Sequence, residues 1–177
     1  MVGIMSILKA AAEEPPETVQ DFNVERYMGT WYEIASFPSW FQKGCSNVRA
    51  TYTLDAAKKK VHVRNECTYY LGRRIKIEGT AVVVGPGKLQ VSFPWQPLWR
   101  LFGNSTAPDG NYWVLATDYV NYALVGNRQR THLWMLSRRP RCYMTADEYD
   151  NMIEIVQQRG FDASRIVQTP DDTPEIQ

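Results

Sequence analysis

The sequence predicts an all-β protein, a single antiparallel up-and-down barrel of eight strands with one C-terminal α-helix packed on its outside. Eight segments rich in β-branched and aromatic residues follow one another, separated by turn residues. No segment with helical periodicity interrupts them, and consecutive strands with short connections are typical of such barrels. The length of 177 residues fits one domain of this kind.

The first element is a capped turn that leads directly into a strand. Residues 24–28 precede Gly29, and we expect the first strand over residues 31–37. Side chains alternate along a strand, so Trp31 and Glu33 share one face. A carboxylate beside a tryptophan indicates either a face that lines a cavity or an edge strand with Glu33 in water. The alternation by itself leaves both interpretations open.

Seven further strands are expected, over residues 47–54, 60–68, 74–84, 88–93, 112–117, 121–126 and 131–138. Tight turns at residues 55–57, 85–87 and 118–120 lie at one end of the barrel, because antiparallel strands alternate in direction. That end is closed, and the longer connections leave the other end open. The start of the first strand and Arg138 both map to the closed end, so we expect the Arg138 guanidinium to lie over the Trp31 indole.

One amphipathic helix follows the barrel. Thr145 and Glu148 form a capping box, and Gly160 is placed to end the helix. Its apolar residues recur at helical spacing on one stripe: Tyr149, Met152, Ile153 and Val156. One stripe requires one partner surface, so we expect this helix to cover the outer wall of the barrel.

Residues 1–20, with Pro15 and Pro16, are expected to be a flexible segment, residues 21–169 the folded domain, and residues 170–177 a flexible tail. A net charge of +1 gives no basic surface for nucleic acid. The sequence has no Ser-His-Asp set, phosphate loop or metal-ligand cluster, so we expect no enzyme activity, no cofactor and no metal site.

The N-terminus lacks the basic region and apolar run of a signal peptide. We therefore expect an intracellular, cytoplasmic protein with peripheral membrane association. The alternative is a secreted or membrane-anchored protein whose signal has been removed.

The three cysteines are Cys45, Cys67 and Cys142. With regular pairing of residues 47–54 and 60–68, Val48 faces Cys67 and Cys45 lies about three residues further along. That separation is too great for a disulfide unless the loop folds back. We therefore expect three free thiols.

Three motifs carry a family resemblance. Gly29-Thr30-Trp31-Tyr32 resembles the first lipocalin signature, Thr117-Asp118-Tyr119 the second, and Arg138 at the end of residues 133–138 the third. They occur in the order and spacing of that family, over residues 22 to about 170. The resemblance is strongest to the group of temperature-induced plant lipocalins, bacterial outer-membrane lipocalins and apolipoprotein D. It implies a stress-response role, and an eight-stranded calyx that carries one small hydrophobic ligand and is held together by Gly29, Trp31, Thr117, Asp118, Tyr119 and Arg138.

The resemblance also places Trp31 inside, and alternation then gives the other inward side chains. The expected ligand-binding residues are Glu33, Tyr52, Asn65, Ile77, Val91, Phe93, Tyr112, Val114, Val125, His132 and Trp134. Ala35, Leu54, Ala116 and Leu136 are expected to fill the tapered end as core. This lining suits a fatty acid, lysophospholipid or sterol. A buried Glu33 is expected to be neutral, or to meet a donor such as Tyr52 or Asn65.

Large apolar residues gather in the loops of the open end. The expected membrane-contact residues are Trp40, Phe41, Trp95, Leu98, Trp99 and Phe102, with Lys43 and Arg100 among them. Such a patch fits a peripheral membrane contact, a lid over the cavity or a homodimer interface.

Two other functions remain open. One is a thiol-dependent lipid isomerase or antioxidant, because Cys45 lies where lipocalin-type prostaglandin D synthase has its cavity thiol. The other is a structural dimer whose barrel is filled and binds nothing.

Overall fold

The computed structural model describes residues 14–39, 42–94 and 109–171. The strands are β1 (Gly29–Ser36), β2 (Ser46–Asp55), β3 (Lys60–Tyr69), β4 (Arg73–Gly85), β5 (Lys88–Ser92), β6 (Tyr112–Thr117), β7 (Tyr122–Gly126), β8 (Leu133–Ser137) and β9 (Val167–Gln168). The α-helices are α2 (Val24–Tyr27) and α3 (Ala146–Gln158), and short 3-10 turns are η2 (Tyr70–Gly72), η4 (Arg141–Tyr143) and η5 (Ala163–Arg165).

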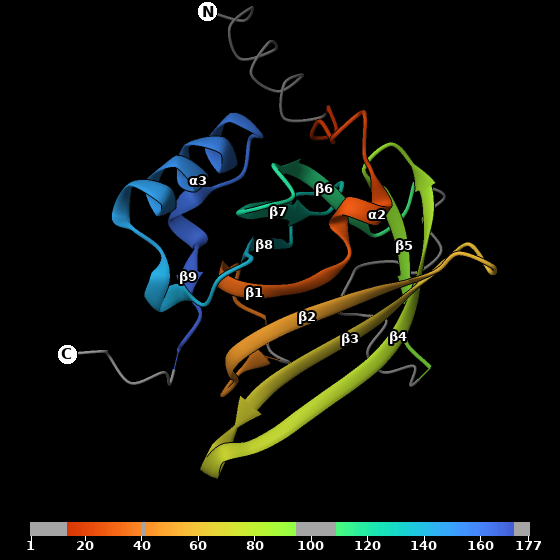
Figure 1. Cartoon of the computed structure of the whole chain (residues 1–177). Helices are drawn as coiled ribbons and strands as arrows, with labels where there is room; N and C mark the ends of the chain where they lie inside the picture. The colour runs from red at the N-terminus through yellow and green to blue at the C-terminus, as the bar shows by residue number, and fades with distance from the viewer. Residues whose placement is uncertain (1–13, 40–41, 95–108, 172–177) are drawn as a thin grey trace, which may run out of the picture.

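Strands β1 to β8 form a closed antiparallel barrel (Figure 1). Each strand pairs with the next in sequence, and β1 completes the circle by pairing with both β8 and β2. This confirms the predicted eight-stranded architecture. The short strand β9 pairs with β1 next to β8, an addition that the sequence pattern did not indicate.

The predicted contact between Arg138 and Trp31 is present at the closed end. The Arg138 guanidinium carbon lies 3.7 Å from the centroid of the Trp31 ring, which is fully buried. The guanidinium also donates hydrogen bonds to the carbonyl oxygens of Thr30 (3.1 Å) and Tyr119 (3.2 Å). Gly29, at φ +97°, leaves room for it, since a Cβ there would lie 3.1 Å from Arg138 Nη1. Arg138 therefore ties three segments together over the indole.

The turn between β6 and β7 is the third part of this closed end. Asp118 accepts hydrogen bonds from three backbone N–H groups, those of Val120, Asn121 and Tyr122. This fixes the turn, and the Tyr119 hydroxyl accepts a hydrogen bond from the backbone N–H of Asn23, 3.0 Å away. The turn thus holds the segment that leads into α2.

The segment just before α2 contacts the barrel through hydrogen bonds. Thr18 Oγ1 donates to the carbonyl oxygen of Pro86 (2.8 Å), and the backbone N–H of Val19 donates to the carbonyl of Val114 (2.9 Å). Thr18 is buried. Thr18 and Val19 therefore satisfy backbone groups of the barrel although they precede the expected domain boundary at residue 21.

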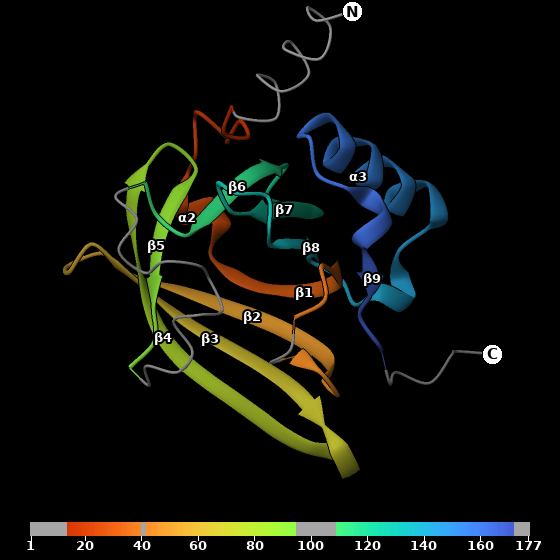
Figure 2. The ribbon, with the colours of Figure 1, turned by 180° about the vertical axis from the view of Figure 1, so that it is seen from behind.

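Helix α3 packs on the outer wall of the barrel, as predicted (Figures 1 and 2). Its capping box between Thr145 and Glu148 is present. Met152 and Val156 are buried in an outer cluster together with residues of β6, β7 and β8: Trp113, Leu115, Leu124, Leu133 and Met135. The barrel wall therefore separates this cluster from the interior.

Two β-bulges change which side chains face inward. The register shifts between Glu33 and Ala35 in β1, and between Val114 and Ala116 in β6. An extra residue reverses the alternation beyond it. Ala35 and Ala116 consequently lie in the outer cluster beneath α3, and the expectation that they fill the interior is wrong.

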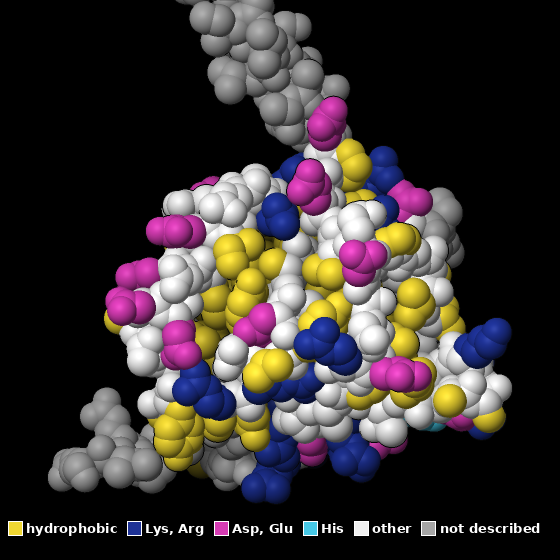
Figure 3. All heavy atoms as spheres, turned by 45° about the horizontal axis from the view of Figure 1, so that its top comes forward, with side chains coloured by type: hydrophobic (Ala, Val, Ile, Leu, Met, Phe, Trp, Pro, Cys, Tyr) yellow, Lys and Arg dark blue, Asp and Glu magenta, His cyan; other side chains and the backbone are white. Residues whose placement is uncertain are grey.

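The surface carries charges of both signs. In Figure 3, acidic and basic side chains are interspersed over the face shown, with hydrophobic side chains between them. Within the described part of the chain, no helix is both long enough and apolar enough to cross a membrane.

Candidate functional site

The interior of the barrel contains a cavity of about 570 Å³, a size typical of sites for small molecules. Seven of the expected ligand-binding residues line it: Glu33, Tyr52, Asn65, Ile77, Phe93, Tyr112 and Trp134. The remaining lining comes from the loop before β2 and from strands β2, β3, β4 and β8: Gln42, Lys43, Cys45, Val48, Arg49, Ala50, Glu66, Cys67, Tyr69, Ile75 and Leu136.

Four expected ligand-binding residues lie elsewhere. Val91, Val114 and Val125 are buried in the inner core cluster, where the rings of Trp31 and neighbouring tyrosines fill the tapered barrel. His132 lies beside the lining, with its ring stacked on Trp134 at a centroid distance of 5.8 Å. Alternation predicted that these side chains point into the barrel, but it could not predict how far the cavity extends along the strands.

Three tyrosine hydroxyls form a hydrogen-bonded chain at the floor of the cavity. The Tyr112 hydroxyl lies 2.8 Å from that of Tyr27 and 2.9 Å from that of Tyr52. Burial raises the pKa of all three phenols, that of Tyr52 to about 12. All three are therefore neutral at physiological pH and able to donate.

Counting protons shows which of these hydroxyls has a free donor. Three hydroxyls carry three protons, and the two hydrogen bonds use two of them. Tyr27 is fully buried with Tyr112 as its hydroxyl partner, so its proton is satisfied only by donation to Tyr112. The uncommitted proton therefore belongs to Tyr52 or Tyr112, and both line the cavity.

Asn65 supplies an unmatched acceptor in the same region. Its side-chain Oδ1 is buried and has no hydrogen-bond partner among the described residues. Val63 is the cross-strand partner of Tyr52, and Asn65 lies two residues further along β3. The backbones of Asn65 and Tyr52 are therefore diagonal neighbours, roughly 7–8 Å apart. The cavity thus presents one free donor and one free acceptor within an otherwise largely apolar lining.

Glu33 is buried at the edge of the cavity, and its partners differ from those expected. Its carboxylate accepts hydrogen bonds from Gln42 Nε2 and Thr169 Oγ1, each at 2.7 Å, and Tyr52 and Asn65 take no part. Burial raises the pKa of Glu33, although the hydrogen bonds from Thr169 and Gln42 oppose this. Glu33 therefore connects the loop before β2 to the C-terminal segment.

The raised pKa of Glu33 predicts a pH-dependent stability. Its protonated form stabilises the fold below the unfolded pKa of about 4.3, and this stabilisation is lost as pH rises through the folded pKa. Glu33→Gln stays neutral throughout, so we expect the variant to gain stability relative to the wild type as pH rises over this interval. Urea denaturation at a series of pH values measures the difference, with Glu154→Gln, an exposed residue in α3, as the control for loss of one charge. A difference between Glu33→Gln and wild type that stays constant with pH contradicts the prediction.

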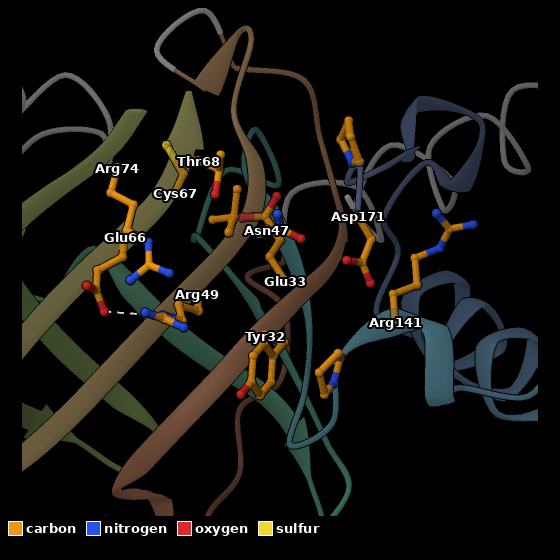
Figure 4. A pocket seen from close by; sticks show the side chains of 13 residues that line it. Tyr32, Glu33, Asn47, Arg49, Glu66, Cys67, Thr68, Arg74, Arg141 and Asp171 are labelled. Carbon is orange, nitrogen blue, oxygen red and sulfur yellow. Dashed lines mark hydrogen bonds and ion pairs between the residues drawn. The ribbon is translucent and has the colours of Figure 1, made fainter. Parts of the chain in front are cut away.

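The barrel wall is incomplete beside Glu33. Pairing between β1 and β2 extends only from Gly29↔Tyr52 to Tyr32↔Arg49. Five residues therefore line both the cavity and a second pocket of about 300 Å³: Glu33, Val48, Arg49, Glu66 and Cys67. Figure 4 shows side chains from β1, β2, β3 and the C-terminal segment around this gap. The Arg49–Glu66 ion pair (3.2 Å) lies on one side of it.

Cys45 and Cys67 form a disulfide, so the expectation of three free thiols is wrong; Cys142 is free and exposed. The register of β2 and β3 shifts between Ser46 and Arg49, where a bulge inserts one extra residue. The loop before β2 also turns back, with the backbone N–H of Cys45 donating to Gln42. Together these bring the two Cα atoms to 5.6 Å.

The disulfide also bears on the thiol-dependent alternative. With Cys45 bonded to Cys67, the cavity wall carries no Cys45 thiolate to act as a nucleophile. The expected membrane-contact residues Trp40, Phe41, Trp95, Leu98, Trp99 and Phe102 lie outside the described residues. Within the described ranges, no group of three His, Cys, Asp or Glu side chains is placed to hold a metal ion.

Comparison with known proteins identifies the class. Residues 22–171 match the model of the lipocalin-like domain, and the chain belongs to the lipocalin family, whose members bind small hydrophobic ligands. It is 42% identical over 165 residues to temperature-induced lipocalin-1 of Arabidopsis thaliana, covering 89% of this chain and 84% of that protein. It is 32% identical to apolipoprotein D of Bos taurus (87% and 79% covered) and 32% identical to outer membrane lipoprotein Blc of Citrobacter freundii (91% and 88% covered).

Solved structures share the fold at lower sequence identity. Apocrustacyanin C1 superposes with a TM-score of 0.65 at 18% identity, covering 91% of this chain and 92% of that one. Insecticyanin from the tobacco hornworm Manduca sexta gives a TM-score of 0.63 at 22% identity, covering 88% and 82%. These likenesses establish the architecture of the barrel alone.

Proposed function

We propose that this lipocalin carries one amphipathic lipid, with its hydrocarbon body in the cavity and a neutral polar end at the tyrosine floor. The observation that carries this proposal is the buried Asn65 Oδ1, which has no partner among the described residues and lines a cavity of about 570 Å³. A buried carbonyl oxygen without a partner is costly, and a donor on the ligand satisfies it.

The polar groups favour a hydroxyl over an ionised acid. A hydroxyl both donates and accepts, and so matches the Asn65 acceptor and the free tyrosine proton together. The cations in the lining are Lys43, in the loop before β2, and Arg49, which is paired with Glu66. Among the described residues, the tyrosine floor itself includes no cation to pair with a carboxylate, whereas a sterol or another long-chain alcohol needs none.

The second part of the proposal is that the protein loads and releases its lipid at a membrane surface. The apolar residues expected in the open-end loops favour such a contact. A relative with 32% identity is named an outer membrane lipoprotein, which agrees with a membrane setting. Partition of the protein onto lipid vesicles tests this part.

Ligand binding is tested by titration with a fluorescent sterol and a fluorescent fatty acid. We expect saturable binding of one sterol per chain. Asn65→Leu is expected to weaken sterol binding about fivefold, the effect of losing roughly 1 kcal/mol of hydrogen bonding. Arg64→Leu is the matched control, because Arg64 is the preceding residue of β3 and points out to pair with Glu78 (3.4 Å).

The outcomes separate the two claims. Absence of saturable binding for both probes contradicts the carrier function. Saturable binding with the same sterol affinity in Asn65→Leu and Arg64→Leu keeps the carrier and refutes the role of Asn65.

A further inference from the structure

The hairpin of β3 and β4 ends in an exposed apolar tip at the open end of the barrel. Tyr70 is 67% exposed and Leu71 is fully exposed. In both ribbon views this hairpin extends beyond the neighbouring strands (Figures 1 and 2). Leu71 has φ +61°, a backbone conformation that leucine rarely adopts. A leucine in a strained turn, with its side chain in water, has no role in packing.

The tip is supported by strand pairing, a disulfide and ring contacts. The β3–β4 ladder is regular from Val61↔Ala81 to Tyr69↔Arg73, and the disulfide joins β3 to the loop before β2. The rings of Tyr69 and Tyr70 meet edge to face at 4.8 Å and lie against Gly44, where a Cβ would be 2.9 Å from the Tyr70 ring. This support holds Leu71 in place without burying it.

Two basic side chains flank the apolar tip. Arg73 and Arg74 begin β4 directly after η2, and both are exposed. In the part of the chain that the structure describes, neither forms an ion pair. Apolar side chains flanked by unpaired arginines are complementary to an anionic lipid surface, where the apolar groups enter the headgroup layer and the guanidinium groups meet phosphates.

The inner face of the hairpin continues the lining of the cavity. Ile75 pairs with Cys67 across the strands, and Ile77 pairs with Asn65. These four residues and Tyr69 all line the cavity. The inner face of the hairpin therefore leads from Tyr69 and its partner Arg73, beside the tip, past Ile75 to Ile77 and the cavity interior.

We propose that the β3–β4 tip inserts into the headgroup layer of an anionic lipid bilayer, and that the inner face of the hairpin guides a lipid chain between bilayer and cavity. This inference rests on the proposed carrier function and assigns its membrane contact to residues 70–74. The tip and the inner face that leads to the cavity belong to one hairpin. The cavity therefore opens toward the bilayer when the tip is inserted.

The test uses Leu71→Asn, because asparagine accepts a positive φ more readily than leucine and so preserves the turn. Val120→Asn is the matched control, since Val120 is 65% exposed at the closed end. On vesicles of phosphatidylcholine and phosphatidylglycerol, we expect Leu71→Asn to lower the partition coefficient roughly fivefold and to slow loading of a fluorescent sterol from the vesicles. Val120→Asn is expected to match the wild type. Thermal unfolding of Leu71→Asn, and its sterol affinity in solution, are expected to be unchanged.

A second variant tests the charges. Arg73→Gln with Arg74→Gln is expected to abolish the preference for vesicles that contain phosphatidylglycerol over vesicles of phosphatidylcholine alone. Wild-type sterol binding without vesicle partition keeps the cavity function and overturns membrane docking. If Leu71→Asn and Val120→Asn partition onto vesicles and load sterol equally, the assignment of the membrane contact to the hairpin is overturned, while membrane docking by another part of the protein is kept. Concentration-dependent dimerisation that Leu71→Asn removes assigns the tip to a second copy of the chain and likewise overturns the proposal.

Discussion

Trp31→Ala is expected to lower the free energy of unfolding by about 4 kcal/mol. The indole is fully buried, its Nε1 donates to the carbonyl oxygen of Tyr27 (2.9 Å), and Arg138 covers its outer face. The substitution removes a large apolar side chain, leaves a void in the tapered end and separates Arg138 from its ring. Urea denaturation monitored by far-UV circular dichroism measures the change.

Trp134→Ala is the matched control for this prediction. Trp134 is 9% exposed, and its ring borders the cavity instead of being enclosed by other side chains. Its removal enlarges an existing cavity, so we expect a smaller loss of stability together with a clear loss of ligand affinity. Equal destabilisation by the two substitutions contradicts the distinction between a packed floor and a cavity wall.

Removal of the disulfide is expected to have the second largest effect. Cys45 and Cys67 are 22 positions apart in the sequence, and closing a loop of this length lowers the entropy of the unfolded chain enough to stabilise the fold by about 3 kcal/mol. The double variant Cys45→Ala with Cys67→Ala is expected to lose about this amount in urea denaturation without reductant.

Cys142→Ala is the control, because Cys142 is exposed and unpaired. Thiol titration of the unfolded wild type without reductant is expected to detect Cys142 alone, and all three cysteines after reduction. Detection of all three before reduction excludes the bond, and in that case the double variant is expected to lose much less stability.

The barrel, its two ends and its closed-end contacts follow from local patterns in the sequence. Strand alternation and turn residues act over a few positions, so the order of β1 to β8 and the place of Arg138 over Trp31 could be derived. The capping box of Thr145 and Glu148 is likewise local, and it fixed the start of α3. Alternation also selected seven residues that line the cavity.

The features that could not be derived depend on single-residue insertions or distant partners. A β-bulge carries little signal in composition, yet the bulges in β1 and β6 moved Ala35 and Ala116 to the outer wall, and the bulge in β2 brought Cys45 to Cys67. The Thr169 partner of Glu33 is 136 residues away. The sequence pattern did not distinguish the Tyr70–Leu71 turn from the other connections at the open end, because apolar residues in a turn give no indication of their exposure.

The short pairing between β1 and β2 leaves part of the barrel wall without backbone hydrogen bonds between these two strands. A barrel with an unbroken ladder has a fixed girth, because widening it separates backbone donors from their acceptors. Beyond Tyr32 and Arg49, side-chain hydrogen bonds from Gln42 and Thr169 to Glu33 connect the neighbouring segments. On this side of the barrel the wall is therefore joined by side-chain contacts to Glu33, whereas elsewhere it is joined by backbone pairing of neighbouring strands.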